Sequence, residues 1–178
     1  MADVIRARGA LLPDVEAIYG IIEPYAQDGT LLPRSRAEIS ENVRDFVVAE
    51  DDGGVVGCGA LHLYGLHLAE IRSIAVPPRK KGCGIGRVLV EALLGEVERN
   101  KVTCVCLFTR TPGFFAHLGF QVARREELPD KIYKDCIHCP KLNDCDEIAM
   151  VRGVMPPNAN GFRDVQITIP LVRAKPGG

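Results

Sequence analysis

The chain has 178 residues, of which 47% are hydrophobic, and this length suffices for one domain with a sizeable core. A net charge of −1, few aromatic residues and the lack of tryptophan argue against a protein that binds nucleic acid by charge or base stacking. No apolar run reaches the ~18 residues of a membrane span, and the N-terminal sequence MADVIRARGALLPD carries mixed charges unlike a signal peptide. We therefore expect a cytoplasmic protein, whose seven cysteines are thiols or metal ligands before they are disulfides.

The first part of the chain predicts a strand, two helices and a hairpin. Pro13 opens a pattern in which apolar residues recur at three- and four-residue spacing, as in an amphipathic helix. Ser35 and Glu38 form a capping box, Ser-x-x-Glu, that begins a second helix. The sequence Asp-Asp-Gly-Gly at 51–54 is typical of a hairpin turn between two β-rich runs. The expected strands are residues 4–8, 47–50 and 55–63, and the second helix is expected to bury Ile39, Val43 and Phe46.

The remainder alternates strands and helices on either side of a glycine-rich turn. A polar strand runs into this turn and an amphipathic helix leaves it. Cys104 and Cys106 share one face of a dense apolar strand, where we interpret them as small buried hydrophobes. Further strands are expected at 70–76, 102–109, 120–124, 148–151 and 165–172, and helices at 86 to about 100 and 114–118. This order predicts a mixed α/β fold in one domain over residues 1–178.

The glycine-rich turn KGCGIG at 81–86 is a candidate phosphate site. Its alternate glycines leave the backbone open at the start of a helix, where N–H groups and the helix dipole favour an anion. Arg79 and Lys80 continue the basic rim of Lys81, which suits an anionic carrier. The spacing lacks the Lys-Ser/Thr of a nucleoside-triphosphate loop and the acidic residue of a dinucleotide fingerprint. A tight strand–helix connection with a solvated basic run is the alternative.

The strand before the turn carries charges that need an explanation. Glu70 and Arg72 alternate along it and are predicted to share one face with Ile74 and Val76. Charges on a central strand are costly unless they are paired or used. One interpretation is a Glu70–Arg72 ion pair at a sheet surface. The other makes Glu70 a general base and Arg72 an anchor for a carboxylate.

The strand EIRSIAVPP and the following RKKGCGIGRVLV together resemble the acetyl-CoA-binding motif of the GNAT acyltransferases, Gln/Arg-x-x-Gly-x-Gly/Ala. Lys81 stands at the Gln/Arg position of that pattern. The segment FFAHLGF at 114–120, and Leu128-Pro129 with the lysines that follow, are similar to segments of amino-acid N-acetyltransferases of the N-acetylglutamate synthase type. The segments GTLLPRS at 29–35 and VGCGAL at 56–61 also resemble that group, so the likeness covers nearly the whole chain.

The resemblance implies a GNAT fold, in which a central mixed sheet with flanking helices splays at the acetyl-CoA site. It also implies acetyl transfer from acetyl-CoA to the α-amino group of L-glutamate or L-glutamine, the first step of arginine biosynthesis. The chain resembles the short form of these enzymes, without a kinase-like domain. The alternatives are a GNAT enzyme acting on another small-molecule amine or a protein N-terminus, and a non-catalytic acetyl-CoA or metal-binding regulatory module. We expect no nucleic-acid or membrane partner, and the strand at 165–172 could pair with a second subunit in a homodimer.

Site residues follow from the resemblance and from the charges. Glu70 is the expected base, and Thr109 is a candidate acid for the leaving thiolate. Arg34, Arg72 and Lys134 are expected to bind the carboxylates of the substrate. The residues expected to bind acetyl-CoA are Ile74, Ala75 and Val76 of the strand, then Lys81, Gly82, Cys83, Gly84, Ile85, Gly86 and Arg87 of the turn, and Phe114 and Phe115.

A cysteine-rich segment at 131–147 lies outside this acyltransferase pattern. Cys136 and Cys139 have the Cys-x2-Cys spacing of metal ligands, and Cys145 with His138 could complete a tetrahedral zinc site. Such a zinc would be structural, holding an irregular lobe near the mouth of the substrate site. The alternatives are a thiol-rich loop packed on the core and a disulfide formed by oxidation. Residues 152–178 are expected to form a strand-bearing C-terminal extension.

Overall fold

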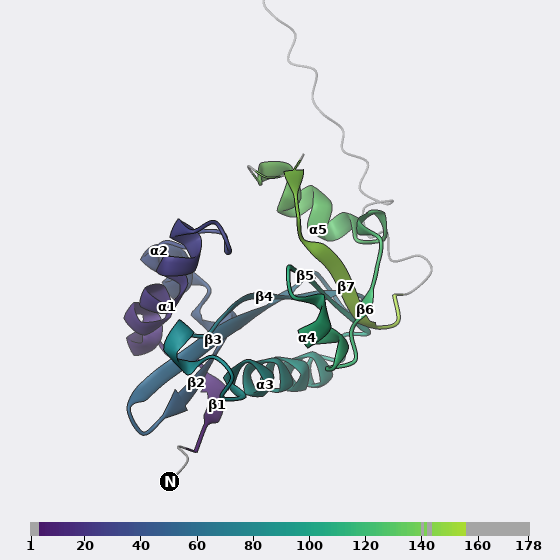
Figure 1. Ribbon diagram of the computed structural model, residues 1–178. Helices are drawn as coiled ribbons and strands as arrows, with labels where there is room; N and C mark the ends of the chain where they lie inside the picture. The colour runs from purple at the N-terminus through teal and green to yellow at the C-terminus, as the bar shows by residue number, and fades with distance from the viewer. Residues whose placement is uncertain (1–3, 140, 142–143, 156–178) are drawn as a thin grey trace, which may run out of the picture.

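A mixed β-sheet forms the centre of the computed structural model, which describes residues 4–139, 141 and 144–155 (Figure 1). Within these residues seven strands lie in the order β1-β2-β3-β4-β5-β7-β6. Neighbouring strands run antiparallel except β4 and β5, which run parallel. The strands are β1 (Arg6–Gly9), β2 (Phe46–Asp51), β3 (Gly54–Leu63), β4 (Ala69–Ala75), β5 (Cys104–Thr109), β6 (Gln121–Val122) and β7 (Ile148–Gly153). The predicted mixed α/β class is confirmed.

Helices cover both faces of the sheet, as Figure 1 shows. The helices are α1 (Val15–Gln27), α2 (Arg36–Glu41), α3 (Ile85–Arg99), α4 (Pro112–Ala116) and α5 (Pro129–Lys134). α3 and α4 pack on one face, over the largest apolar core. On the other face, α1 and α2 cover β2 and β3, whereas Leu128, just before α5, packs over β5 and β7. The residues under α1 and α2 and the residues around Leu128 form separate core clusters, and β4 lies between these clusters.

Local sequence signals account for several element ends. The Ser35 hydroxyl accepts a hydrogen bond from the Glu38 N–H, and the Glu38 carboxylate accepts one from the Ser35 N–H, so the predicted capping box is confirmed. The helix it begins is shorter than expected and ends at Glu41. Val43 lies in a 3₁₀ turn and Phe46 begins β2, yet both pack in the cluster beneath α1. None of the helices in the described ranges has the length and apolar character that a membrane crossing needs.

The predicted irregular segment contains a short α-helix. α5 (Pro129–Lys134) was not expected, and the fully buried Leu128 that precedes it packs on Cys104 and Cys106. The prediction that these two cysteines are buried hydrophobes is thereby confirmed, and burial raises the pKa of both thiols. The expected strand at 165–172, and the homodimer contact that it suggested, lie outside the described residues.

A β-bulge interrupts β4 at Ser73, which has a φ of 55°. Ala60 of β3 pairs with Arg72 and Cys58 pairs with Ala75, so two residues of β4 lie opposite the single Gly59. The extra residue reverses the alternation of side chains along the strand. A Cβ on Gly59 would lie 2.5 Å from the Ile74 side chain, so the glycine leaves room for Ile74.

The bulge corrects one prediction about β4. Ile74 and Val76 pack in the core under α3, whereas Ala75 packs in the cluster under α1. Glu70 and Arg72 face the opposite side from Ile74, toward a cavity. The prediction that Ile74 and Val76 share a face with Glu70 and Arg72 was therefore wrong, because a bulge breaks strict alternation.

The parallel pair β4–β5 is short. The strands pair only at Ala69–Val105 and Glu70–Cys106, after which they separate. β5 continues to pair with β7 along its whole length, and β4 continues to pair with β3. The edge of β4 that faces β5 is therefore unpaired by described strands beyond Glu70, as the expected splay requires.

Candidate active site

A cavity of about 260 Å³ opens where β4 separates from β5. Its walls come from the α1–α2 loop, β4, β5 and the lobe that follows β6. The charged lining side chains described by the structure are mainly basic. The basic ones are Arg34, Arg72, Arg110, Arg125, Lys131 and Lys141, and the acidic ones are Glu70, Asp135 and Glu147. Such a lining favours an anionic ligand.

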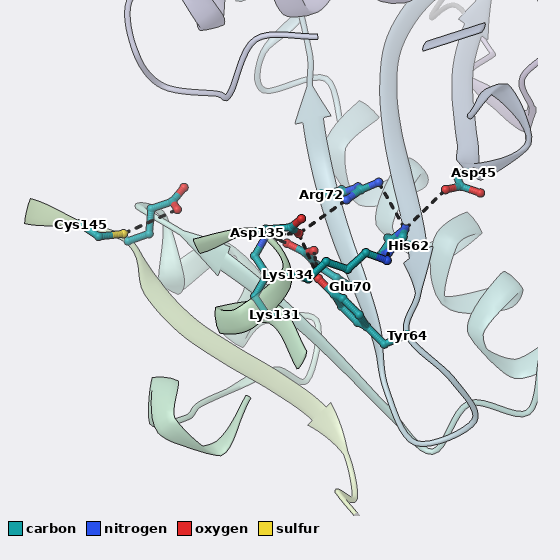
Figure 2. A network of polar contacts seen from close by, with 10 residues as sticks. Asp45, His62, Tyr64, Glu70, Arg72, Lys131, Lys134, Asp135 and Cys145 are labelled. Atoms are coloured by element: carbon teal, nitrogen blue, oxygen red, sulfur yellow. Dashed lines mark hydrogen bonds and ion pairs between the residues drawn. The ribbon is translucent and has the colours of Figure 1, made fainter. Parts of the chain in front are cut away.

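Glu70 lies in this cavity and is held by two partners (Figure 2). Its Oε1 lies 2.7 Å from the Nζ of Lys131, and its Oε2 accepts a hydrogen bond of 2.9 Å from the Tyr64 hydroxyl. The Glu70 and Lys131 side chains are only 3% and 10% exposed, so the ion pair is buried. The interpretation of a Glu70–Arg72 pair was therefore wrong, because Lys131 is the cation beside Glu70.

Asp135 joins this network from the end of α5. Its Oδ2 accepts hydrogen bonds of 3.0 Å from Lys131 and 3.1 Å from the Tyr64 hydroxyl. Arg72 Nη1 lies 3.8 Å from the same oxygen. Although burial alone would raise it, the pKa of Asp135 is lowered by Lys131 and Arg72. Two carboxylates and two cations thus form one compensated cluster beside the cavity (Figure 2).

Arg72 and Lys134, both expected to bind substrate, lie differently. Arg72 lines the cavity and also lies 3.3 Å from Nδ1 of His62. The Lys134 Nζ lies 2.8 Å from Nε2 of the same histidine and is not among the lining residues (Figure 2). The structure therefore brings Arg72, but not Lys134, to the cavity.

Arg34 enters the cavity from the α1–α2 loop and is half-buried. It makes no hydrogen bond or ion pair with the residues in the described ranges. Burial, and then the neighbouring Arg72 guanidinium, lower the pKa of Arg34. A half-buried cation beside another cation is unfavourable, and an anionic ligand would relieve it.

Two other basic residues tie this loop to the opposite wall. Arg110 Nη1 donates a hydrogen bond of 2.7 Å to the Thr30 carbonyl and also pairs with Asp146. Lys141 Nζ donates one of 3.0 Å to the Gly29 carbonyl. These contacts hold the loop that contains Arg34 against the opposite wall of the cavity.

The three cysteines of the cysteine-rich segment also line the cavity. Cys136, Cys139 and Cys145 are half-buried free thiols, and burial raises the pKa of Cys136. Over the described residues, no group of three or more His, Cys, Asp or Glu side chains is placed to hold a metal ion. The predicted zinc site therefore finds no support in this part of the chain.

The glycine-rich turn begins α3 as expected. Gly82 and Gly84 have φ angles of 82° and 79°, which only glycine adopts readily. Gly82, Cys83 and Gly84 are exposed, and the free N–H groups of the first helical turn follow directly. The Phe114 ring would lie 3.3 Å from a Cβ at Gly86, so it packs against the turn.

Other predicted residues support the site from the core or lie apart from it. Ile85 and Phe115 are buried in the core beneath the turn. The Thr109 hydroxyl is buried, accepts a hydrogen bond of 2.9 Å from the Thr111 N–H, and is not among the cavity's lining groups. The role of Thr109 as an acid stays a prediction.

Sequence reasoning missed Tyr64, Lys131 and Asp135 as parts of the site. Lys131 and Asp135 are spaced four residues apart, which is typical of a helical ion pair and was the available signal. Tyr64 follows the last residue of β3 and offered no comparable signal.

Comparisons with known proteins agree with this geometry. A family model described as an acetyltransferase (GNAT) domain matches residues 42–122. An uncharacterized N-acetyltransferase of Chlorobaculum tepidum is 45% identical over 145 residues, which cover 82% of this chain and 94% of the relative. An amino-acid acetyltransferase of Mycobacterium tuberculosis is 40% identical over 116 residues, 64% of this chain and 66% of the relative. The amino-acid acetyltransferase of Pasteurella multocida is 32% identical over 70% of this chain, which spans only 29% of that protein's length.

Two solved structures share the fold. The protein Rv2747 from Mycobacterium tuberculosis, in complex with CoA and NLQ, has a TM-score of 0.72 and 30% identity, covering 83% of this chain and 98% of its own. N-acetylglutamate synthase from Neisseria gonorrhoeae, complexed with coenzyme A and N-acetyl-glutamate, has a TM-score of 0.76 and 28% identity, covering 86% of this chain and 36% of its own. The fold, the matched domain model and the relative that the chain covers almost entirely show that the chain belongs to the GNAT acetyltransferase family.

Proposed function

We propose that this acyltransferase moves the acetyl group of acetyl-CoA to the α-amino group of L-glutamate or L-glutamine, the first step of arginine biosynthesis. The observation that carries the proposal is Arg34, a half-buried guanidinium without a hydrogen-bond or ion-pair partner in the described chain. It faces a cavity that also contains the buried carboxylate of Glu70. An amino acid offers an anion to the first group and an amine to the second.

The donor would bind along β4 and the glycine turn. The pyrophosphate of acetyl-CoA would accept hydrogen bonds from the exposed backbone of Gly82–Arg87 at the start of α3. The pantetheine arm would follow the open edge of β4 near Ile74–Val76 toward Glu70. The Tyr25 hydroxyl already donates to the Val76 carbonyl, so the arm would use N–H groups of this segment. The presence of coenzyme A in the related structures of Rv2747 and the Neisseria enzyme supports acetyl-CoA as the donor.

The chemistry needs a base and a polarised carbonyl. The ammonium group of the acceptor loses a proton to Glu70, directly or through water, and the free amine attacks the thioester carbon. Backbone N–H groups of the open β4 edge would stabilise the oxyanion that forms. When the tetrahedral intermediate collapses, the new C–N bond remains, the C–S bond breaks and the nitrogen gives up its second proton to water. CoA leaves as a thiolate and takes up one proton from solvent or from an acid such as Thr109.

The cations around the cavity favour an anionic acceptor. Arg34 and Arg72 would bind the α-carboxylate and the distal group of the amino acid. Lys134 would have to leave His62 in order to take part. The N-acetyl-glutamate bound to the Neisseria enzyme supports an acceptor of this size and charge. Glutamate and glutamine differ only in the distal group, and the proposal includes both.

The other functions have less support. A polyamine would meet the repulsion of Arg34 and Arg72, and a protein N-terminus would have to pass the loop that Arg110 and Lys141 hold. A non-catalytic module is disfavoured by membership of an acetyltransferase family. A structural zinc at the three cysteines likewise has no support from their arrangement in the described residues.

A panel of single amino acids tests the proposal. Release of CoA from acetyl-CoA is measured with each acceptor, and turnover with glutamate or glutamine is the expected result. Turnover only with other amines, or binding of acetyl-CoA without turnover with any acceptor, would overturn it. Arg34→Gln should raise the acceptor KM about tenfold or more, as loss of a charged hydrogen bond does, and leave the acetyl-CoA KM unchanged. Arg36→Gln is the matched control, because Arg36 pairs with Glu16 on the surface.

A further inference from the structure

We infer that Tyr64 and Asp135 form a proton relay that carries the proton taken up by Glu70 out to solvent. The relay rests on the proposed role of Glu70 as the base. Neither Tyr64 nor Asp135 needs to touch the reacting atoms, since both act through Glu70.

The position of the Tyr64 hydroxyl is the main observation (Figure 2). It lies 2.9 Å from Glu70 Oε2 and 3.1 Å from Asp135 Oδ2, within hydrogen-bond distance of two carboxylates at once. A phenol has one proton and can donate it fully to only one of them. The hydroxyl therefore connects the two carboxylates through a single transferable proton.

The Tyr64 ring is fixed in this position. Its backbone N–H donates to the Leu68 carbonyl at 3.0 Å, which closes the β3–β4 connection. Its ring packs edge-on against His62, with 4.9 Å between ring centroids. Tyr64 is not a lining residue of the cavity, so it reaches the acceptor only through Glu70.

The two carboxylates differ in their access to solvent. The Glu70 side chain is 3% exposed and the Asp135 side chain is 26% exposed. Both carboxylates line the cavity, but Asp135 is the more accessible of the two to water. The direction of transfer is therefore from Glu70, through Tyr64, to Asp135.

The charges of the cluster favour release at the outer end. Lys131 contacts both carboxylates, and although burial alone would lower it, the pKa of Lys131 is raised by Glu70 and Asp135. Lys131 therefore stays charged while protons move past it. Burial and the two carboxylates raise the pKa of Tyr64, which keeps the phenol neutral, and the lowered pKa of Asp135 lets it give up a proton readily.

Two protons move in the relay. After Glu70 has accepted the amine proton, the Glu70 O–H bond breaks and this proton passes to the Tyr64 oxygen. At the same time the original Tyr64 O–H bond breaks, and its proton passes to Asp135. Glu70 returns to a carboxylate, Tyr64 is again a neutral phenol, and Asp135 is protonated. Asp135 then loses this proton to water, so one proton has entered and one has left.

Tyr64→Phe and Asp135→Asn test the relay, since the first removes the bridging hydroxyl and the second removes the acceptor of the proton. Each should lower kcat for amino-acid acetylation about tenfold or more, less than the roughly hundredfold or more expected for the group that takes the proton directly, with little change in either KM. The double variant should be no slower than the slower single variant, because the two residues act as a unit. Tyr19→Phe is the control, since Tyr19 lies beneath the Arg36 guanidinium away from the cavity.

Two further readouts separate a relay from a structural role. The solvent deuterium effect on kcat should fit two or more moving protons in the native enzyme and one in Tyr64→Phe. A structural role would instead lower the melting temperature or raise the KM values without changing the proton number. Unchanged kcat in both variants, while Glu70→Gln is inactive, would overturn the relay and leave the proposed function standing. Full activity of Glu70→Gln would overturn the relay together with the role of Glu70 as base, and would leave the proposed acceptor standing. No acetylation of amino acids by the native chain would overturn both the relay and the proposed function.

Discussion

Replacing Lys131 with methionine would remove an ammonium group from a buried ion pair while keeping a side chain of similar length. Glu70 would lose a partner at 2.7 Å and keep only the Tyr64 hydroxyl on its other oxygen. Because both side chains of the pair are almost fully buried, the remaining carboxylate is poorly solvated. The free energy of unfolding should fall by about 3–5 kcal/mol, as it does when one member of a buried pair is removed. Asp135 also loses Lys131 but is partly exposed, so it should add little.

The loss of stability in this variant should become smaller as the pH falls. Without Lys131, the folded variant buries a carboxylate with no ammonium group beside it. Binding of a proton removes this buried charge and so favours the folded state, which makes the cost largest near neutral pH and smaller as the pH falls. In the native chain the pKa of Asp135 is lowered, so this group loses its contribution to stability only when the pH falls below the unfolded value of about 3.9. Asp135 therefore causes no change in stability between about pH 5 and 8.

Urea denaturation at several pH values between 5 and 8 measures both effects. The variant should gain stability relative to the native chain as the pH falls. Lys134→Met is the matched control, since this exposed lysine lies three residues further along the chain and, within the described residues, its ammonium group contacts His62 and the Tyr64 ring rather than a carboxylate. A loss below about 1 kcal/mol that is the same at every pH would show that Lys131 and Glu70 do not form a buried ion pair.

Three other predictions concern the base, the glycine turn and the cysteines. Glu70→Gln should leave acetyl-CoA binding intact and lower turnover about a hundredfold or more; near-normal CoA release would remove Glu70 from the role of base. Gly84→Ala should raise the acetyl-CoA KM about tenfold, because a left-handed conformation costs a residue with a Cβ about 1–2 kcal/mol. The control Gly95→Ala, where an added Cβ would meet no atom within 4 Å, should leave that KM unchanged. Elemental analysis of protein purified without a His tag should find less than one equivalent of zinc, and a stoichiometric ion would show that the cysteines adopt an arrangement other than the described one.

Features set by neighbouring residues were predictable from the sequence. The capping box at Ser35, the glycine turn before α3 and the apolar strand β5 all depend on short-range patterns, and the structure has them where expected. α5 was missed because a helix of this length is marginal by itself. It is fixed by the burial of Leu128 against β5, a contact between distant parts of the sequence.

The candidate site divides in the same way. The prediction placed Glu70, Arg72 and Arg34 in one binding region, and the structure brings all three to one cavity. Lys134 was preferred over Lys131 although both follow the same Leu-Pro pair, because spacing alone does not tell which lysine turns inward. Lys131 becomes the partner of Glu70 because the lobe after β6 folds back toward β4. No local pattern in the sequence encodes this contact between distant segments.

The bulge at Ser73 makes the length of β4 as important as its composition. One surplus residue divides the strand into an acceptor-facing part with Glu70 and Arg72 and a part whose side chains anchor it beneath α3. Deleting Ser73 would leave Ile74 directly after Arg72, so simple alternation alone would keep Ile74 on the α3 face and Ala75 on the face of Arg72. The bulge therefore absorbs one surplus residue without exchanging the faces of the residues that follow. Forcing the present sequence into simple alternation would instead turn Ile74 toward α1, and Ala75 would be too small for the space that Ile74 fills beside Gly59. Among relatives of this chain, a strand one residue shorter should lack the bulge and keep the same two faces.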